Sequence, residues 1–320
     1  MTEPALRLGT LRLGSRKSPM AIVQSELVAR LITERTGRRV EIVGVTTLGD
    51  VSRAQLTQIG GTGVFVSALR EALLGGEVDL AVHSLKDLPA GAARGITLAA
   101  VPPRDDPRDA LAARDGAKLA DLPAGARIGT GSPRRAAQLL ALRGDLQTVP
   151  IRGNAGTRLR KVSDGELDGV VLAAAGLARI GQQNAITQVF EPDEMLPAPG
   201  QGALAVECRD DDPELAGLLA AVNDEASMAA AVAERSLLEA LAVGCSAPVG
   251  GYAAGTGQLL MRAAVLSPDG TRALRAHGSA PAADARRLGQ DLAAELLRRG
   301  AADFISSPMD PTSSSGNDVQ

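Results

Sequence analysis

The sequence predicts an α/β protein in which two similar α/β domains are followed by a smaller α+β domain. Short apolar runs, at residues 6–13, 40–45, 78–82 and 169–172, alternate with longer helical stretches. Such alternation is typical of βαβ units around a mostly parallel sheet. Related segments recur within the first 200 residues, and a helical stretch, a glycine-rich loop and a strand-like remainder follow them.

Two predicted helices begin with the same Ser-Pro pair and end before a glycine. Ser18-Pro19 opens a helical stretch that Gly37 closes, and each of these residue types is a usual signal at its position. Ser132-Pro133 opens another, which Gly144 closes. Each start follows a strand through a glycine and a hydroxyl residue. We therefore expect two facing domains that present helix N-termini to a shared crevice.

A second pair of related segments starts at Gly76-Glu-Val-Asp and at Gly165-Glu-Leu-Asp, and each leads from a polar turn into a buried strand. Proline-rich stretches at 101–107 and 196–202 mark two crossings between the domains, which implies a hinge. The expected division is domain 1 at 1–102 and 200–221, domain 2 at 103–199, domain 3 with Cys245 at 222–305, and a disordered tail at 306–320.

The composition excludes several classes of protein. Of the 320 residues 45% are hydrophobic and 1% aromatic, and the formal net charge is −3, so we expect no nucleic-acid partner. The longest nearly apolar run, 170–178, is far shorter than the roughly 20 residues of a membrane span. The first residues lack the apolar core of a secretory signal, and two cysteines make no disulfide framework. We expect a cytoplasmic protein that does not bind a membrane.

Basic residues stand at both helix starts, where the helix dipole disfavours cations. Arg134 and Arg135 lie in the first turn of the second helix, and Arg16 and Lys17 precede the first. A bound carboxylate or phosphate would resolve this conflict. Alternatively, these arginines fold back onto acidic neighbours at the surface. The matching positions favour anion binding.

Further basic residues follow in the second domain. Arg152 and Arg158 flank a turn that leads into a helix, and Arg179 closes another helical segment. The turn lacks the Gly-Lys-Ser/Thr ending of a nucleotide P-loop, so we expect no nucleotide site.

A predicted buried strand runs directly into a polar turn, so Ser84, Lys86 and Asp87 should lie at the mouth of the crevice. Asp87 is either an ordinary turn residue or a carboxylate that accepts hydrogen bonds from N–H donors and stabilises a developing cation. His83 is interpreted as a core residue. No cluster of His and Cys has metal-ligand spacing, so no metal is expected.

Cys245 stands in a loop of small residues, after Gly244 and before Gly250-Gly251. Such a loop permits a bulky group to approach the sulfur, although free cysteines are most often inert and buried. Cys208, in a strand-like run, fits that inert description.

The ordered motifs resemble those of the porphobilinogen deaminase, or hydroxymethylbilane synthase, family from near Leu11 to about residue 300. They are Arg16-Lys-Ser-Pro, Gly63-Val-Phe, His83-Ser-Leu-Lys-Asp-Leu-Pro, Asp106-Pro-Arg-Asp, Ser132-Pro-Arg-Arg, Arg152-Gly-Asn-Ala-Gly-Thr-Arg, Pro199-Gly-Gln-Gly and Gly244-Cys.

The resemblance implies two domains like those of type II periplasmic binding proteins and a third that carries a dipyrromethane cofactor, thioether-linked to Cys245. It implies a transferase that deaminates four porphobilinogen molecules and condenses them head to tail on this cofactor. Hydroxymethylbilane and ammonia would be released, in tetrapyrrole (heme) biosynthesis. It further implies a monomer whose product passes to uroporphyrinogen-III synthase.

Residue roles follow from the matching positions. The resemblance implies that Asp87 is catalytic, contacting pyrrole N–H groups and stabilising positive charge. Because each porphobilinogen carries an acetate and a propionate, the arginines would pair with carboxylates. Cofactor binding is implied for Cys245, Lys86, Asp87, Ser84, Thr130, Ser132, Arg134, Arg135 and Arg158. Substrate binding is implied for Arg16, Ser18, Arg152, Arg158, Arg179, Phe65 and Gln201.

The chain departs from the family pattern at four positions. Thr62 and Gln58 stand where lysines are common, which leaves the contacts of that segment open. Gly131 replaces a common serine, and Pro133 replaces a common leucine at a position where proline is tolerated.

Two other functions compete with this one. A binding protein of the same two-domain architecture would capture an anionic solute without chemistry, but the third domain, its cysteine and Asp87 count against it. A phosphoester-handling transferase would need a nucleotide loop or a metal cluster, and the sequence has neither.

Overall fold

In the computed structural model the described residues are 9–46, 64–244 and 247–305, and of residues 64 and 65 the backbone alone. Some predictions concern residues outside this description. They are the apolar run before Gly9, the departures Gln58 and Thr62, the side chain of Phe65, Cys245 and the tail 306–320.

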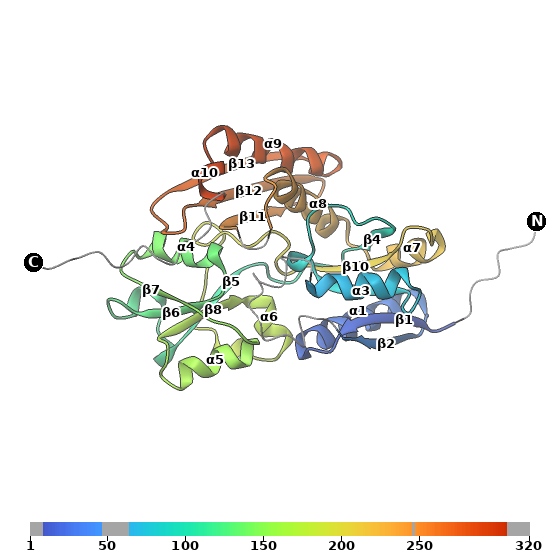
Figure 1. Cartoon of the computed structure of the whole chain (residues 1–320), viewed down its shortest axis with the longest axis horizontal. Coiled ribbons are helices and arrows are strands. Elements are labelled where there is room, and N and C mark those ends of the chain that lie inside the picture. Colours follow the sequence, from blue (N-terminus) through green and yellow to red (C-terminus); the bar gives the residue numbers. More distant parts are fainter. Residues whose placement is uncertain (1–8, 47–63, 245–246, 306–320) are drawn as a thin grey trace, which may run out of the picture.

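Three β-sheets organise the chain, and each belongs to a separate unit (Figure 1). The first sheet, β2-β1-β3-β10-β4, contains β1 (Leu11–Arg16), β2 (Val40–Val45), β3 (Leu80–Ser84), β4 (Ile96–Ala100) and β10 (Leu204–Arg209). The second, β7-β6-β8-β5-β9, contains β5 (Asp109–Ala113), β6 (Arg127–Thr130), β7 (Gln147–Pro150), β8 (Gly169–Ala173) and β9 (Gln188–Val189). The third is β11 (Val249–Ala254), β12 (Gln258–Leu266) and β13 (Ala273–Pro281).

Helices accompany each sheet. The first unit contains α1 (Pro19–Thr36), α3 (Val64–Leu74) and α7 (Pro213–Leu219). The second contains α4 (Pro133–Leu142), α5 (Ala155–Ser163) and α6 (Ala174–Arg179). The third contains α8 (Glu225–Ala240), α9 (Ala285–Arg298) and α10 (Ala302–Ile305). Short 3₁₀ helices are η2 (Leu85–Asp87), η3 (Arg114–Gly116), η4 (Leu119–Asp121), η5 (Gln183–Ala185), η6 (Ala220–Val222) and η7 (Ala282–Asp284). The predicted fold class, two α/β domains and a smaller α+β domain, is confirmed.

Both α/β sheets are mixed: four of the five strands in each share one direction, as expected for a mostly parallel sheet, and one strand is reversed. In the first, β1 runs parallel to β2 and β3, whereas β10 is antiparallel to β3 and β4. In the second, β6 is parallel to β7 and β8, whereas β5 is antiparallel to β8 and β9. The reversed strands are β5 and β10, and the chain enters each of them directly after a crossing. They occupy the same position in the strand order of the two sheets.

The predicted repeat is visible in hydrogen bonds. In the first sheet, Arg12 N donates to Asp79 Oδ2 over 2.8 Å, and Asp79 N donates to Arg12 O over 2.8 Å. In the second, Arg127 N donates to Asp168 Oδ2 over 2.7 Å, and Asp168 N donates to Arg127 O over 2.9 Å. In both halves, therefore, an aspartate stands directly before the central strand and makes the same pair of hydrogen bonds to the neighbouring strand.

The two predicted helix starts are present, but one helix end differs. Ser18 and Ser132 both adopt N-cap positions whose hydroxyls accept a backbone N–H, and Gly37 ends α1 in the left-handed conformation with φ 71°. Helix α4 ends at Leu142, and its C-cap is the extended Arg143 rather than Gly144. The side chain of Arg143 donates to the carbonyl oxygens of Leu119 and Leu122, which holds this residue against the segment before β6.

Each unit has its own apolar core, because each sheet buries its own face. The largest fully buried members include Leu13 and Leu80 in the first unit, Leu111 and Ile128 in the second, and Leu237 and Leu259 in the third. Two smaller clusters of described residues join the third unit to the others, one with Ala231 against Leu85 and one with Ala264 against Ala137.

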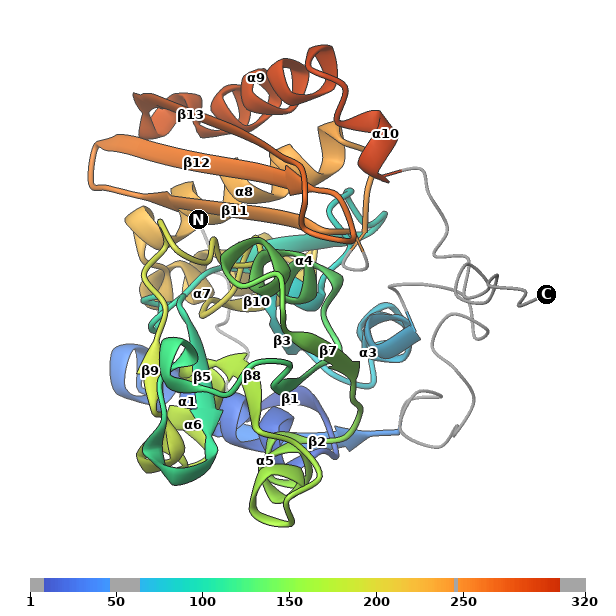
Figure 2. The same ribbon diagram turned by 90° about the vertical axis from the view of Figure 1, so that its left-hand side faces the viewer.

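A buried ion pair joins the third unit to the crossings. Arg104 NH1 lies 2.6 Å from Oε1 of Glu234, whose side chain is fully buried on α8, and Arg104 Nε donates to Gln201 O over 2.8 Å. Glu234 also accepts the N–H of Gly200 at 2.5 Å. Both crossings thus contact one carboxylate of α8. Figures 1 and 2 place the third unit over the junction of the other two.

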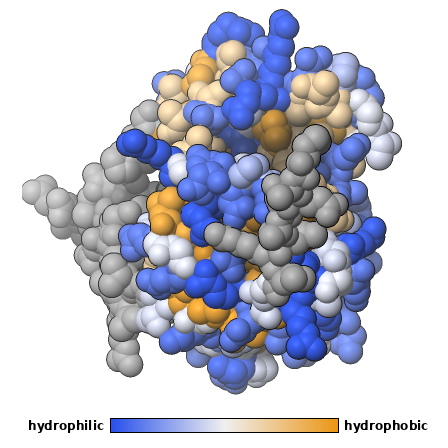
Figure 3. Space-filling model, turned by 90° about the vertical axis from the view of Figure 1, so that its right-hand side faces the viewer, coloured by the Kyte–Doolittle hydropathy of each residue, from blue (hydrophilic) through white to orange (hydrophobic). Residues whose placement is uncertain are grey.

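The surface that Figure 3 shows is mostly hydrophilic, with smaller hydrophobic patches between charged residues. Among the described residues no single helix is long and apolar enough to cross a membrane, and one bent pair, Pro213–Val222 with Glu225–Ala240, matches a span by length and composition alone.

Gly202 lies where the two crossings contact each other, and this position has no room for a side chain. Its φ is +88°, and a Cβ would lie 2.5 Å from Asp105 O. We predict that Gly202→Ala lowers the free energy of unfolding by at least about 1 kcal/mol, because the left-handed conformation alone costs that much. The matched control is Gly217→Ala in α7, where nothing lies within 4 Å of the added Cβ.

Urea unfolding measures both variants. Gly217→Ala should be neutral or stabilising by up to about 1 kcal/mol, because alanine favours a helix. Equal stability of Gly202→Ala and the original chain would contradict the role of Gly202.

Candidate active site

Asp87 lies where two cavities meet. Strand β3 ends at Ser84, and η2 carries the chain to Asp87, which is exposed. One cavity, of about 180 Å³, lies at the junction of all three units, and we call it the junction cavity. The other, of about 80 Å³, lies at the start of α1, and we call it the α1 cavity. Asp87 is a wall residue of both.

The junction cavity collects side chains from all three units. The first unit contributes Lys86 and Asp87, the second contributes Ser132, Arg134 and Arg135, the returning crossing contributes Gln201, and the third contributes Leu238, Gly244, Ala247 and Val249. Gly244 and Ala247 stand on either side of residues 245–246.

Arg134 and Arg135 share one buried carboxylate. Arg134 NH1 lies 2.7 Å from Asp109 Oδ2, and Arg135 Nε donates to Asp109 Oδ1 over 2.8 Å. Burial by itself would raise the pKa of Asp109, but the charges of Arg134 and Arg135 outweigh it and hold that pKa well below its usual range. The fold-back alternative is thus half correct: both arginines meet an acidic residue, but it is buried, and both still line the cavity.

Gln201 connects this cluster to the first unit. Its side chain is fully buried, and Nε2 donates to Asp109 Oδ1 over 2.9 Å and to Pro107 O over 2.7 Å. Its Oε1 accepts from Lys86 Nζ and from Arg135 NH2, each at 3.3 Å. The amide therefore joins groups of both cavity walls through one side chain.

The cavity holds more positive than negative charge. Burial, with the nearby Arg135, lowers the pKa of Lys86 to about 8, although Asp87 and Asp109 oppose the shift. Burial also lowers the pKa of Arg134. Among the described residues, the carboxylates recorded beside Lys86, Arg134 and Arg135 are those of Asp87 and Asp109. An anionic ligand would complete this balance.

The α1 cavity has a second cationic wall. Arg16 ends β1, Ser18 caps α1, and the first turn of α1 contains no acidic residue. Pro19 has no N–H, and the N–H groups of Ala21 and Ile22 bind Ser18, which leaves the N–H of Met20 and the helix dipole to favour an anion. Ser84 and Asp87 face Arg16 and Ser18 across this cavity.

Four described residues from the predicted set line neither cavity. Thr130 is buried, and its Oγ1 accepts the N–H of Ser132 over 3.2 Å. Arg158 donates to Gly153 O, and its pKa is lowered by burial and by Arg135. Arg152 is exposed. Arg179, the fourth, lies 2.8 Å from Asp105 Oδ2 and donates to Gly202 O over 2.7 Å.

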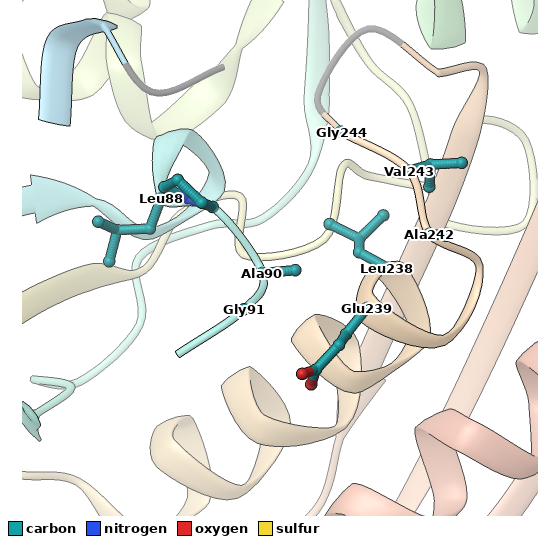
Figure 4. A pocket seen from close by; sticks show the side chains of 9 residues that line it. Leu88, Ala90, Gly91, Leu238, Glu239, Ala242, Val243 and Gly244 are labelled. Carbon is teal, nitrogen blue, oxygen red and sulfur yellow. The ribbon is translucent and has the colours of Figure 1, made fainter. Parts of the chain in front are cut away.

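A third cavity adjoins the junction cavity, sharing Leu238 and Gly244 with it (Figure 4). The turn Leu88–Gly91 forms one wall, and the end of α8 with Ala242 and Val243 forms the other. Its one ionisable wall residue is Glu239. Without a cation it is unsuited to carboxylate ligands, so an anionic ligand of the junction cavity should extend toward Arg16 instead.

Sequence reasoning missed the partners of the arginines. Asp109 was visible only as the last residue of Asp106-Pro-Arg-Asp, and an acidic residue at the start of a buried strand was the available signal. Gln24, whose Nε2 donates to Ser84 Oγ, was also missed.

His83 and Cys208 behave as expected. His83 is buried, with Nε2 3.3 Å from Glu207 Oε2, and burial raises the pKa of Cys208 to about 11. Among the described residues no group of His, Cys, Asp and Glu could hold a metal ion.

These features define a class of protein with two α/β units, a third α+β unit and a cation-lined cavity at their junction. Residues 11–217 match the family model described as "Porphobilinogen deaminase, dipyromethane cofactor binding domain", and residues 228–298 match its C-terminal domain. The chain belongs to the porphobilinogen deaminase family.

Curated relatives agree over nearly the whole chain. Porphobilinogen deaminase of Thermobifida fusca is 56% identical over 307 residues, covering 92% of this chain and 95% of that protein. Porphobilinogen deaminase 1 of Streptomyces coelicolor is 53% identical, covering 95% and 98%. A solved periplasmic substrate-binding protein from Coxiella burnetii covers 67% of this chain and 92% of its own, with 19% identity and a TM-score of 0.43. That distant likeness says nothing about activity.

The electrostatics of Lys86 can be measured in the chain with Cys245→Ser, in which no group is attached at that position. We predict that its amine reacts with acetic anhydride with an apparent pKa of about 8. Adding Arg135→Met should raise this apparent pKa, because it removes a neighbouring positive charge.

Competitive labelling followed by peptide mass analysis gives the apparent pKa of this one amine. An apparent pKa near the ordinary lysine value of about 10.4 would contradict the described environment. So would an unchanged apparent pKa after Arg135→Met.

Proposed function

We propose that this porphobilinogen deaminase uses Asp87 as its catalytic carboxylate, between a substrate held in the α1 cavity and a chain end held in the junction cavity. The observation that carries this proposal is that Asp87 lines both cavities. A condensation needs both reacting carbon atoms beside one another, and a carboxylate between the cavities reaches both.

The residues around the junction cavity fit a dipyrromethane cofactor. Burial lowers the pKa values of Lys86 and Arg134, so carboxylate groups there would restore charge balance. Gly131 also lines this cavity, and its backbone lies close to Ile151, since a Cβ there would lie 2.7 Å from Ile151 O. Cys245 is the proposed attachment point, because its neighbours Gly244 and Ala247 line this cavity. Lys86, Ser132, Arg134 and Arg135 would hold the cofactor carboxylates, with Ser84, Thr130 and Arg158 in supporting positions.

The cofactor, when bound, supplies the free pyrrole carbon on which the chain grows. The residues of the protein do the rest. Arg16 and the first turn of α1 bind a carboxylate of porphobilinogen and orient its aminomethyl group toward Asp87. The carboxylate of Asp87 stabilises the positive charge that develops as the C–N bond breaks and ammonia leaves. It then accepts hydrogen bonds from pyrrole N–H groups, so the ring stays aligned.

Four condensations, each with loss of ammonia, would add four pyrrole units to the cofactor, and hydrolysis of the bond between the cofactor and the first added unit would then release hydroxymethylbilane. Each condensation adds two carboxylates that need partners. Arg152, Arg158 and Arg179 are the proposed partners for the longer chain, with Phe65 and Gln201 as further substrate contacts. Arg179 would have to exchange its ion pair with Asp105 for a substrate carboxylate. That exchange would act on the crossing itself, because Arg179 also binds Gly202 O.

Several further properties remain proposals. The domain boundaries are 1–102 with 200–221, 103–199 and 222–305, followed by the tail. The protein is a cytoplasmic monomer that binds neither nucleic acid nor membrane and passes its product to uroporphyrinogen-III synthase. A binding protein without chemistry is disfavoured by membership of an enzyme family.

Asp87→Asn tests the catalytic role, because asparagine keeps the size of the side chain and removes its charge. We predict that kcat falls by about 100-fold or more while the melting temperature is unchanged. The control is Glu26→Gln on the exposed face of α1, which should leave kcat unchanged. A kcat for Asp87→Asn within threefold of the original would remove Asp87 from the mechanism.

Intact-mass measurement tests the attachment at Cys245. The purified chain should exceed its sequence mass by one dipyrromethane, and the Cys245→Ser variant should have the mass of its sequence alone. Cys208→Ser is the control and should retain the added mass, since that thiol is buried in β10. An active chain without added mass would refute the proposed attachment.

A further inference from the structure

The hydroxyl of Ser84 is held by a residue of another element. Gln24 lies in the second turn of α1, is 5% exposed, and its Nε2 donates to Ser84 Oγ over 2.8 Å. Both residues line the α1 cavity with Arg16 and Asp87. Figure 2 shows α1 beside the first sheet, to which β3 belongs, and α1 packs on β3.

This contact decides which way the Ser84 hydroxyl works. A serine hydroxyl has one proton to donate and two lone pairs to accept with. The amide of Gln24 occupies a lone pair, so the proton of Ser84 must point elsewhere. Ser84 makes no side-chain capping bond at the start of η2, and among the described residues no acceptor for its proton is recorded. The remaining direction is the cavity.

A hydroxyl fixed in this way suits an anion. Arg16 and the start of α1 already favour a carboxylate in the cavity, and a donated O–H adds a charge-assisted hydrogen bond. The opposite orientation would present lone pairs to the carboxylate and repel it. An acceptor in place of the Gln24 N–H would therefore reverse the preference of the site.

We infer that Gln24 is a positioning residue that fixes Ser84 as a hydrogen-bond donor to a pyrrole carboxylate in the α1 cavity. The inference rests on the proposed function, because it takes that cavity as the substrate site. Gln24 acts through Ser84 and sets substrate affinity rather than the rate of bond breaking.

The test compares Gln24→Met and Gln24→Glu in the full, cofactor-carrying chain. Methionine removes the N–H donor at similar volume, so we expect KM to rise about fivefold with little change in kcat, as for a lost net hydrogen bond. Glutamate accepts a hydrogen bond from the Ser84 hydroxyl, so the lone pairs of Ser84 then face the cavity. The rise in KM should therefore be larger than for Gln24→Met. Lowering the pH should reduce the difference in KM between the Gln24→Glu variant and the original chain, because a protonated carboxyl donates to Ser84 as the amide does.

The Ser84→Ala variant shows whether Gln24 acts through Ser84. Gln24→Met should change KM less than twofold in that background if Gln24 acts through Ser84. Ser25→Ala is the matched control, since Ser25 is fully buried on the same turn of α1 and its Oγ has no hydrogen-bond partner. It should leave KM unchanged. Thermal unfolding of every variant shows whether the helix still packs.

A binding measurement separates this inference from the proposed function. The probe is a pyrrole that carries an acetate and a propionate but no aminomethyl group, studied by calorimetry. If the cavity is not the substrate site, variants of Arg16 as well as of Gln24 will leave probe affinity unchanged. Two results would show that only the inference is wrong. In one, Arg16→Met weakens binding of the probe whereas Gln24→Met does not. In the other, Gln24→Met weakens binding of the probe equally in the original chain and in the Ser84→Ala background.

Discussion

The site depends on one buried carboxylate that two arginines share. Asp109 cannot neutralise both Arg134 and Arg135, and Lys86 adds a third positive charge to the same cavity. Burying several positive charges together is costly, so a ligand that brings negative charge would stabilise this arrangement. A dipyrromethane, whose side chains are carboxylates, would do so. In the proposed function, the ion pairs between β5 and α4 would thus prepare the cavity for the cofactor.

The same carboxylate ties ligand binding to the hinge. Asp109 begins β5 directly after the first crossing, and Gln201, on the second, donates to it. Charge changes in the cavity therefore act on groups that join the two crossings, since Gln201 also donates to Pro107 O. Arg104 and Glu234 extend this network to α8, which leads to the loop of Cys245. The cationic wall, both crossings and α8 share one connected set of hydrogen bonds.

The end of α8 fixes the direction in which that loop leaves. Ala242 has φ 55°, Ala242 N donates to Glu239 O over 3.0 Å, and Val243 N donates to Leu238 O over 3.2 Å. This Schellman pattern usually has glycine at the left-handed position, and alanine there costs about 1 kcal/mol. Strain of this size is tolerated where it directs the chain toward a functional position.

Local signals in the sequence predicted much of this structure, and non-local pairing explains the rest. Ser18 and Ser132 begin their helices because N-caps and proline act within one turn. Asp87 could be placed at a strand end because a buried run precedes it. The reversed direction of β5 and β10 depends on which strands meet after a crossing, and a single sequence does not encode that visibly. The pairing of Asp109 with Arg134 joins residues 25 positions apart for the same reason.

A crystal structure of the cofactor-carrying enzyme tests the central claim most directly. Continuous density should run from Sγ of Cys245 into the junction cavity, with cofactor carboxylates within hydrogen-bond distance of Arg134 or Arg135 and pyrrole N–H groups facing Asp87. Density that leads away from this cavity, or pyrrole rings far from both arginines, would contradict it.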